Sequence, residues 1–305
     1  MVADSGRPGL LTGPATPGRR YQAIGRVLWR VLLLNVLVAG AEISIGLFVG
    51  SVAILSGGFH SLTDAASNVV ALVGISIARR PPDANHPYGH RKFETMAAGG
   101  ILLFLLLVLL EVVSAAVTGL REGGTPEVEG LGVAVVVGTL VVNLFVMRYE
   151  TREGVRLGSE ILRADARHTR ADVFISFAVL AALAGVWLGY PLLDPLAALA
   201  VAVFIGRACW QIANDASGIL SDEIVIDPGR LRGVVLGVPG VLGCEKIRTR
   251  GSRDHVFLDL HLWVPGDWTL DHAHETSHVV KAQLMEAFPQ IADAVIHVEP
   301  PPTDR

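Results

Sequence analysis

The chain has 305 residues, enough for two domains, of which 51% are hydrophobic and only 18% are charged. The charged share is below the roughly 25% usual in soluble globular proteins, so the composition predicts a membrane protein. The formal net charge is −4 and the basic residues are dispersed among apolar runs, which gives no reason to infer nucleic-acid binding. The two cysteines, Cys209 and Cys244, form no disulfide framework or thiolate metal motif.

The first part of the chain, residues 1–24, is rich in Gly, Pro and Arg and has no apolar period. This pattern predicts a disordered cytoplasmic tail. The segment also lacks the apolar core and small-residue cleavage site of a signal peptide. We therefore expect the first membrane span to stay in the mature protein.

Apolar stretches follow over residues 25–215, each close to the roughly 20 residues that a helix needs to cross a bilayer. Their spacing predicts an all-α domain of six transmembrane helices. The first two stretches are almost contiguous, which predicts a tight helical hairpin, and Gly189, Tyr190 and Pro191 predict another short turn between the last two. The six stretches are 28–50, 52–78, 94–118, 129–149, 167–189 and 192–213.

Positive residues gather on one side of the predicted spans, and short cytoplasmic loops are enriched in Lys and Arg. This asymmetry predicts that both termini are cytoplasmic in a multi-pass protein, and we expect the plasma (inner) membrane. The residues are Arg19, Arg20, Arg26 and Arg30 before the first span, Arg79, Arg80, Arg91 and Lys92 after the second, and Arg148, Arg152, Arg156, Arg163 and Arg167 after the fourth.

The remaining residues, 216–305, have the composition of a small soluble domain. Val256, Leu258, Leu260 and Leu262 alternate with more polar residues, as in a half-buried strand. The expected order is αββαβ, which predicts a compact α+β cytoplasmic domain with helices on one face of a sheet. The predicted helices cover residues 227–237 and 270–287, and the predicted strands cover 243–250, 255–264 and 293–298.

Two pairs of ionisable residues lie in or at the edge of apolar runs, each with helical i, i+4 spacing. They are His60 with Asp64 and His168 with Asp172. An Asp near the middle of a membrane helix costs about 2.5–3.5 kcal/mol, so such residues face partners or a polar pathway. Two imidazoles and two carboxylates can form the tetrahedral shell that suits zinc. The alternative is that both pairs only join packed helices by hydrogen bonds.

A second candidate metal site lies in the loop PPDANHPYGHRKFE, where Asp83, His86 and His90 could hold one ion. The alternative is a solvated polar loop. Single polar residues inside the spans, Asn35, Glu42, Glu111 and Asn143, either line a water-filled path or join helices.

The third candidate site lies in the tail, where histidines crowd into three predicted elements. His297 and Glu299 are two apart on a strand, so they share a face and can converge on one ion. Surface histidines without a function are the alternative. The tail histidines are His261, His272, His274, His278 and His297.

These segments resemble the cation diffusion facilitators, membrane transporters that exchange a divalent metal for protons. The resemblance covers about residues 25–300 and rests on HSLTD, the PPDANHPYGHRKFE loop, DARHTRAD, RTRGS, DLHLWV and VIHVEP. It implies six spans, a metallochaperone-like tail and a homodimer. His and Asp on both helices look like the zinc-preferring branch.

The resemblance also implies roles for individual positions. The transport site would be His60, Asp64, His168 and Asp172, the loop site Asp83, His86 and His90, and the tail site His261, His274, His297 and Glu299. This chain departs from the pattern in the tail, where Glu245 stands in place of a His found in some relatives and Glu299 in place of an Asp. The departures weaken the case for a two-metal tail site.

The sequence therefore predicts a proton-coupled antiporter that exports a divalent cation, most simply zinc, because protons and metal compete for the same His and Asp side chains. Iron, cobalt, cadmium and manganese stay open as substrates. The alternative from another class is a membrane metal sensor that binds without transport. We expect a transporter rather than an enzyme. A membrane metalloenzyme, which would need an open coordination position and a catalytic base, is a third possibility, and an ATP-driven pump is disfavoured by the lack of a G-x-x-x-x-G-K-[ST] loop.

Overall fold

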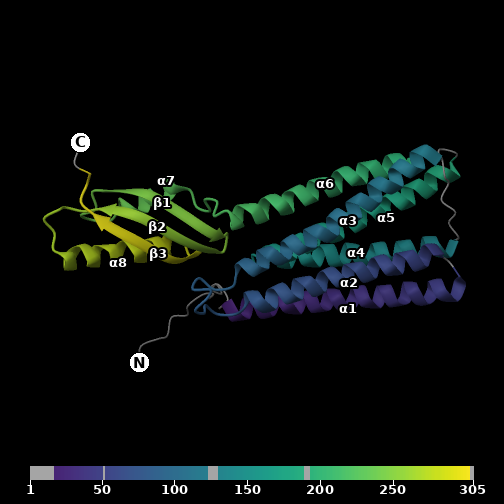
Figure 1. Ribbon diagram of the computed structural model, residues 1–305, viewed down its shortest axis with the longest axis horizontal. Helices are drawn as coiled ribbons and strands as arrows, with labels where there is room; N and C mark the ends of the chain where they lie inside the picture. The colour runs from purple at the N-terminus through teal and green to yellow at the C-terminus, as the bar shows by residue number, and fades with distance from the viewer. Residues whose placement is uncertain (1–16, 51, 123–129, 189–192, 303–305) are drawn as a thin grey trace, which may run out of the picture. The chain divides into compact units, whose positions relative to one another are not determined.

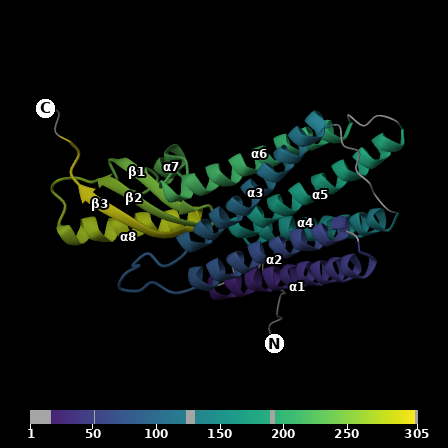
Figure 2. The same cartoon turned by 45° about the vertical axis from the view of Figure 1, so that its right-hand side comes forward.

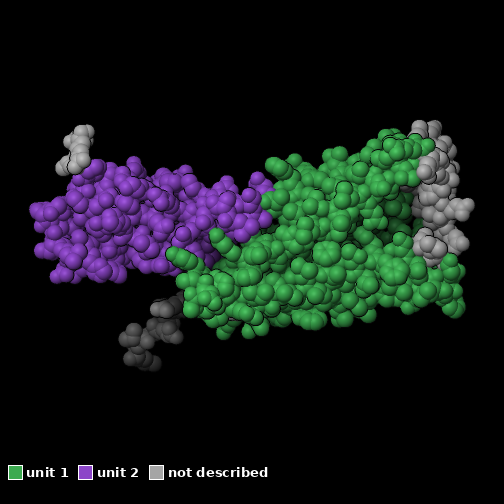
Figure 3. All heavy atoms as spheres, viewed as in Figure 1, with its two compact units in different colours: residues 1–213 green, residues 214–305 purple. Residues whose placement is uncertain are grey.

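The computed structural model describes residues 17–50, 52–122, 130–188 and 193–302 (Figure 1). They belong to two compact units, residues 1–213 and 214–305, coloured green and purple in Figure 3. Each unit is described by itself below. The expected tail up to residue 16 and the expected turn at Gly189–Pro191 lie outside the described residues.

The first unit is built from long helices, as the apolar stretches predict. Five of them are long and apolar enough to cross a membrane. Helix α5 is the exception among the described helices, because its first half carries charged residues such as Arg163, Arg167 and Arg170. The helices are α1 (Pro17–Val49), α2 (Val52–Ala78), α3 (Lys92–Glu122), α4 (Gly130–Arg156), α5 (Glu160–Trp187) and α6 (Leu193–Leu220).

Helices α1 and α2 lie side by side as the predicted hairpin (Figures 1 and 2). Two glycines permit their close approach. A Cβ atom on Gly46 would lie 2.8 Å from the backbone nitrogen of Leu55, and one on Gly58 would lie 2.6 Å from Cγ1 of Ile43. Small residues at such crossings let membrane helices pack backbone against backbone. Helix α4 packs against α5, and α3 packs against both α2 and α5.

Helix α1 begins at Pro17, earlier than the boundary expected at residue 25. The reason is a buried polar cluster that the sequence pattern does not reveal. Arg20 donates to the Glu94 carboxylate at 3.0 Å and to the carbonyl oxygens of Leu157 and Gly158 at 2.8 and 2.9 Å. The Ser159 hydroxyl donates to Glu94 at 2.6 Å. This Arg20 cluster joins the first turns of α1 and α3 to the α4–α5 turn.

The second unit has the expected order αββαβ. Its elements are α7 (Pro228–Val235), β1 (Gly243–Ser252), β2 (His255–Trp263), α8 (Leu270–Ala287) and β3 (Ile291–Glu299). The strand order is β1-β2-β3, with β1 antiparallel and β3 parallel to β2, so α8 forms the crossover that a parallel pair requires.

One face of β2 forms the core of this unit. Leu258, Leu260 and Leu262 are buried together with Leu231 of α7 and Leu284 of α8. The residues between the leucines are only half-buried, which confirms the predicted alternation. The helices begin at side-chain caps, where Asp227 accepts from the backbone N–H of Arg230 and Thr269 from that of His272. Because the leucines occupy one face of β2, the opposite face is available for polar side chains.

Replacing Glu94 by Ala should lower the free energy of unfolding by about 3–5 kcal/mol, because it leaves the buried Arg20 guanidinium without its carboxylate. Denaturation with sodium dodecyl sulfate in mixed micelles measures the change. The matched control is Glu153→Ala, which removes an ion pair to the largely exposed Arg156 and should cost about 0–1 kcal/mol. Equal losses in the two variants would contradict a structural role for the Arg20 cluster.

Candidate metal centres

The first centre lies between α2 and α5, and we call His60, Asp64, His168 and Asp172 the transmembrane centre. Each helix contributes an i, i+4 pair on one face. The contacts cross between the helices, with His60 Nε2 3.6 Å from Asp172 Oδ1 and His168 Nε2 3.2 Å from Asp64 Oδ1. The structure thus brings all four predicted ligands together.

The two His–Asp distances in this centre are close to the edges of a tetrahedral metal shell. Metal–ligand bonds of about 2.0–2.2 Å give a tetrahedron with edges of about 3.3–3.6 Å. Ligand atoms of His60, Asp64 and Asp172 lie within 4.8 Å of one another, and His168 joins them through its contact with Asp64. Asp172 Oδ1 and His168 Nδ1 are buried and have no hydrogen-bond partner within the described part of the chain. The donor set therefore fits a divalent cation, with ligand atoms of three residues close together and His168 in contact with one of the three.

A polar network that the sequence analysis did not single out lies next to this centre. Asn35 donates to Asn68 at 2.9 Å, and Asn68 donates to the buried Asp165 at 2.7 Å. Thr169 donates to the buried Glu150 at 3.0 Å. A signal was present, since Asn68 and Asp165 extend the helical spacing of the two His–Asp pairs by another turn. The network joins α1, α2, α4 and α5 around the centre.

The single polar residues of the spans have different surroundings. Asn35 takes the helix-joining role that was one of its two interpretations. Glu42 is buried and accepts from the hydroxyls of Ser61 at 2.7 Å and Thr139 at 2.6 Å, so it joins α1 to α2 and α4. Glu111 is exposed on α3 and Asn143 is half-buried on α4.

The loop between α2 and α3 brings its three predicted ligands together, and we call Asp83, His86 and His90 the loop cluster. Asp83 contacts His86 Nδ1 at 3.2 Å and His90 Nε2 at 3.3 Å. The backbone N–H of His86 donates to Asp83 and, with smaller contributions from its side chain and from Asn85, holds the Asp83 pKa below its usual value. His90 is buried, and Gly89 makes the turn with a φ of 84°. The carboxylate is thus kept ionised and aimed at both imidazoles.

The tail contains a third group, His261, His297 and Glu299, which we call the tail cluster. His261 on β2 pairs in register with His297 on β3, and Glu299 contacts them at 2.9 and 3.5 Å. The hydrogen bond with His261 holds the pKa of Glu299 below its usual value. Glu245 on β1 is the register partner of His261, and its carboxylate contacts Lys246 at 3.3 Å.

His274 does not join the tail cluster within one chain. It lies on α8 with its Nε2 3.2 Å from Nε2 of His278, one helical turn away. His272, also on α8, lies against the Trp268 ring. The structure therefore brings together three of the four predicted tail ligands.

Residues 28–221 match the family model of the cation efflux transmembrane domain, and residues 226–301 match that of the cation efflux protein cytoplasmic domain. The chain belongs to the cation efflux family. It is a multi-pass integral membrane protein that transports divalent metal cations, and it is not an enzyme. The resemblance seen in the sequence is thereby confirmed at the level of the family.

Relatives cover nearly the whole chain. The cation-efflux pump FieF of Cronobacter sakazakii is 32% identical, over 90% of this chain and 94% of its own. The uncharacterized transporter MJ0449 of Methanocaldococcus jannaschii is 30% identical, over 87% of this chain and 94% of its own. A solved structure of CzrB in a zinc form is 30% identical and covers 26% of this chain and 96% of its own, with a TM-score of 0.24.

Metal binding by the tail tests the grouping of its histidines. The substitutions Asp64→Ala and Asp83→Ala remove one ligand from each of the other two centres. In a full-length chain that carries both, His297→Ala should weaken zinc binding at least about tenfold, because it removes a ligand of the tail cluster. Chelator competition at neutral pH measures the affinity. His278→Ala is the matched control and should leave it unchanged. An equal loss in His274→Ala and His297→Ala would instead put His274 in the same site.

Proposed function

We propose that this cation efflux transporter is a proton-coupled antiporter that exports zinc from the cytoplasm through the transmembrane centre. The observation that carries the proposal is the crossing of the two His–Asp contacts between α2 and α5, at 3.6 and 3.2 Å. Ligands contributed by two helices tie the affinity of the centre to the separation of those helices. A site of this kind binds in one arrangement and releases in another.

The ligand set favours zinc among the divalent cations. Two imidazole nitrogens and two carboxylate oxygens can form a tetrahedral shell that suits zinc, whereas magnesium and calcium prefer more oxygen ligands. Affinity order and geometry leave iron, cobalt, cadmium and manganese as competitors, since imidazole also suits several of these ions. Flux measurements with each ion decide between them.

Proton coupling follows from the chemistry of the same four side chains. His60 and His168 bind metal only when neutral, and Asp64 and Asp172 only when ionised, so protons and metal compete. An imidazole changes its charge near physiological pH more readily than other side chains. A deprotonated centre facing the cytoplasm would take the metal, and protonation from the opposite side would release it.

The direction of transport rests on the charge asymmetry of the loops. The arginine-rich connections would face the cytoplasm, so both termini and the tail would be cytoplasmic in a plasma (inner) membrane. The loop cluster and the tail cluster would then sample cytoplasmic metal. Proton entry down its gradient would drive metal outward.

The tail supports a regulatory role and a homodimer. Its match to the cytoplasmic domain of cation efflux proteins and its cluster of three ligands support metal binding outside the membrane. Metal bound at His261, His297 and Glu299 would favour one packing of two tails and so bias the transport domains. A sensor without transport would use the same cluster, and flux separates it from the antiporter.

The first test is zinc uptake by acid-loaded proteoliposomes. Uptake should follow the outward proton gradient in the native chain and fall to background in Asp64→Ala/Asp172→Ala, because two of the four ligands are lost. The matched control is Thr63→Ala, an exposed position on α2 beside the centre, which should transport normally. Zinc binding without flux of any tested ion would favour the sensor. Gradient-driven flux that survives the double substitution would reject the proposed centre.

The regulatory role has its own test. His261→Ala/His297→Ala should change the dependence of flux on metal concentration while leaving the transmembrane centre intact. Initial rates over a range of zinc concentrations, at matched protein amounts in the vesicles, measure this dependence. An unchanged curve would count against regulation by the tail cluster, whatever the outcome for the transmembrane centre.

A further inference from the structure

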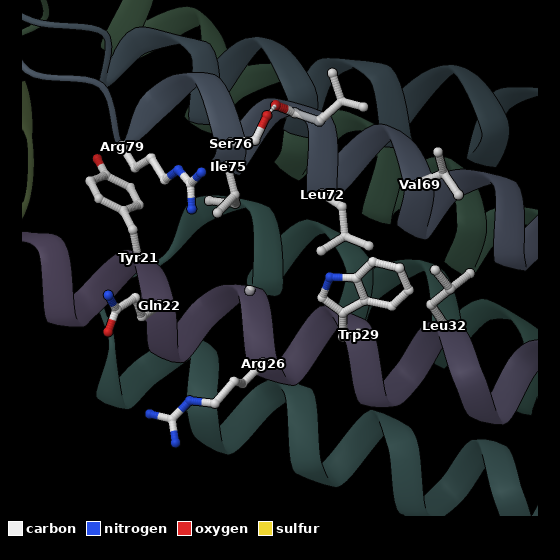
Figure 4. Close-up of a pocket in the computed structure, with 12 residues that line it drawn as sticks. Tyr21, Gln22, Arg26, Trp29, Leu32, Val69, Leu72, Ile75, Ser76 and Arg79 are labelled. Atoms are coloured by element: carbon white, nitrogen blue, oxygen red, sulfur yellow. Dashed lines mark hydrogen bonds between the residues drawn. The ribbon is translucent and has the colours of Figure 1, made fainter.

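A groove of about 730 Å³ runs between α1 and α2, outside all three metal centres (Figure 4). It extends from Tyr21 to Leu32 along α1, a length of about 16 Å at 1.5 Å per residue. Both helices are long and apolar enough to span a membrane, and Trp29, Val69 and Val73 along the α1–α2 groove are exposed, so this surface would lie against the bilayer.

The two ends of the α1–α2 groove differ in chemistry. Gln22, Arg26 and Arg79 lie toward one end, whereas Trp29, Leu32, Val69 and Leu72 form the other (Figure 4). Arg79 projects from α2 beside the Tyr21 ring, whereas the Arg26 side chain leaves α1 on the side turned away from α2. The groove therefore offers a cationic end and an apolar end in line, which is the pattern of a phospholipid.

The charges of the groove are unbalanced. None of its twelve described lining residues is acidic. Other arginines of the helical unit have partners, such as Arg20 with Glu94 and Arg30 with the Tyr149 hydroxyl. Arg26 and Arg79 are exposed and have no side-chain partner within the residues that the structure describes. A cationic groove between helices at the membrane surface favours an anionic ligand.

We infer that the α1–α2 groove binds an anionic phospholipid, with its phosphate at Arg79 and an acyl chain along Trp29 and Leu72. Arg26, on the other side of α1, adds positive charge near the same end. Long arginine side chains can reach a headgroup while their stems stay on apolar surface. Trp29 is largely exposed and has the amphipathic ring that gathers at the level of headgroups. The inference depends on the membrane location of the helices and not on the metal or its coupling to protons.

Native mass spectrometry of the full chain tests the headgroup. Phosphatidylglycerol should be retained in preference to phosphatidylcholine with the same acyl chains. Arg26→Gln/Arg79→Gln should reduce this preference about tenfold or more, because both guanidinium groups are lost. The control Arg19→Gln/Arg80→Gln removes the same charge from exposed positions at the same helix ends and should keep the preference. Equal retention of both lipids by the native chain, or equal losses in the two double variants, would overturn the inference.

A second pair of variants tests the shape of the groove without changing its charge. A side chain on Gly25 would meet nothing within 4 Å of its Cβ, so Gly25→Leu can fill the groove without a clash. The matched control is Gly40→Leu, which has equal space on α1 outside the groove. Phosphatidylglycerol retention should fall in the first variant only. If Gly25→Leu instead dissociates a dimer and leaves lipid retention unchanged, the groove holds a second copy and the lipid assignment is wrong.

Discussion

The burial of two carboxylates between apolar helices is the constraint on which the transport domain depends. Each Asp in a bilayer costs about 2.5–3.5 kcal/mol, so it needs a partner. Asp64 meets His168 and Asp172 faces His60, so the carboxylate of each helix faces the imidazole of the other. Separating α2 from α5 would leave both carboxylates without their histidine partners at the same time. The contacts within the centre therefore depend on the relative position of these two helices.

The other buried polar groups around the centre also need partners from neighbouring helices. Asp165 takes its partner from α2, Glu150 from α5, and Glu42 from both α2 and α4. At the end of the bundle where α1 begins, Glu94 of α3 holds Arg20 of α1. Apolar surfaces of membrane helices pack with little specificity against lipid or one another, whereas these buried bonds permit few alternative pairings. The polar residues therefore set the order and depth in which the helices pack.

The sequence predicted most of the architecture because its signals are local. Long apolar stretches, the alternation along β2 and the i, i+4 His–Asp pairs all depend on neighbours a few positions away. Contacts between distant residues were missed. Arg20 lies 74 positions from Glu94, and Asn68 lies 97 positions from Asp165. For this reason the sequence predicted a start of α1 later than the observed one. The separation of His274 from His261 likewise depends on how α8 packs, which the sequence pattern does not reveal.

The three groups of ligands differ in how they depend on helix position. The three residues of the loop cluster lie in one loop, between α2 and α3. Backbone N–H groups in that loop already hold the Asp83 carboxylate toward its histidines. The tail cluster is fixed by the register of β2 and β3. Neither needs two helices of the first unit to meet, so under the proposed function both would keep an ion while those helices move. The transmembrane centre alone among these described groups joins candidate ligands from two long helices, α2 and α5. In the proposed transport cycle its affinity would change with the separation of those helices, which is what carrying an ion across a bilayer requires.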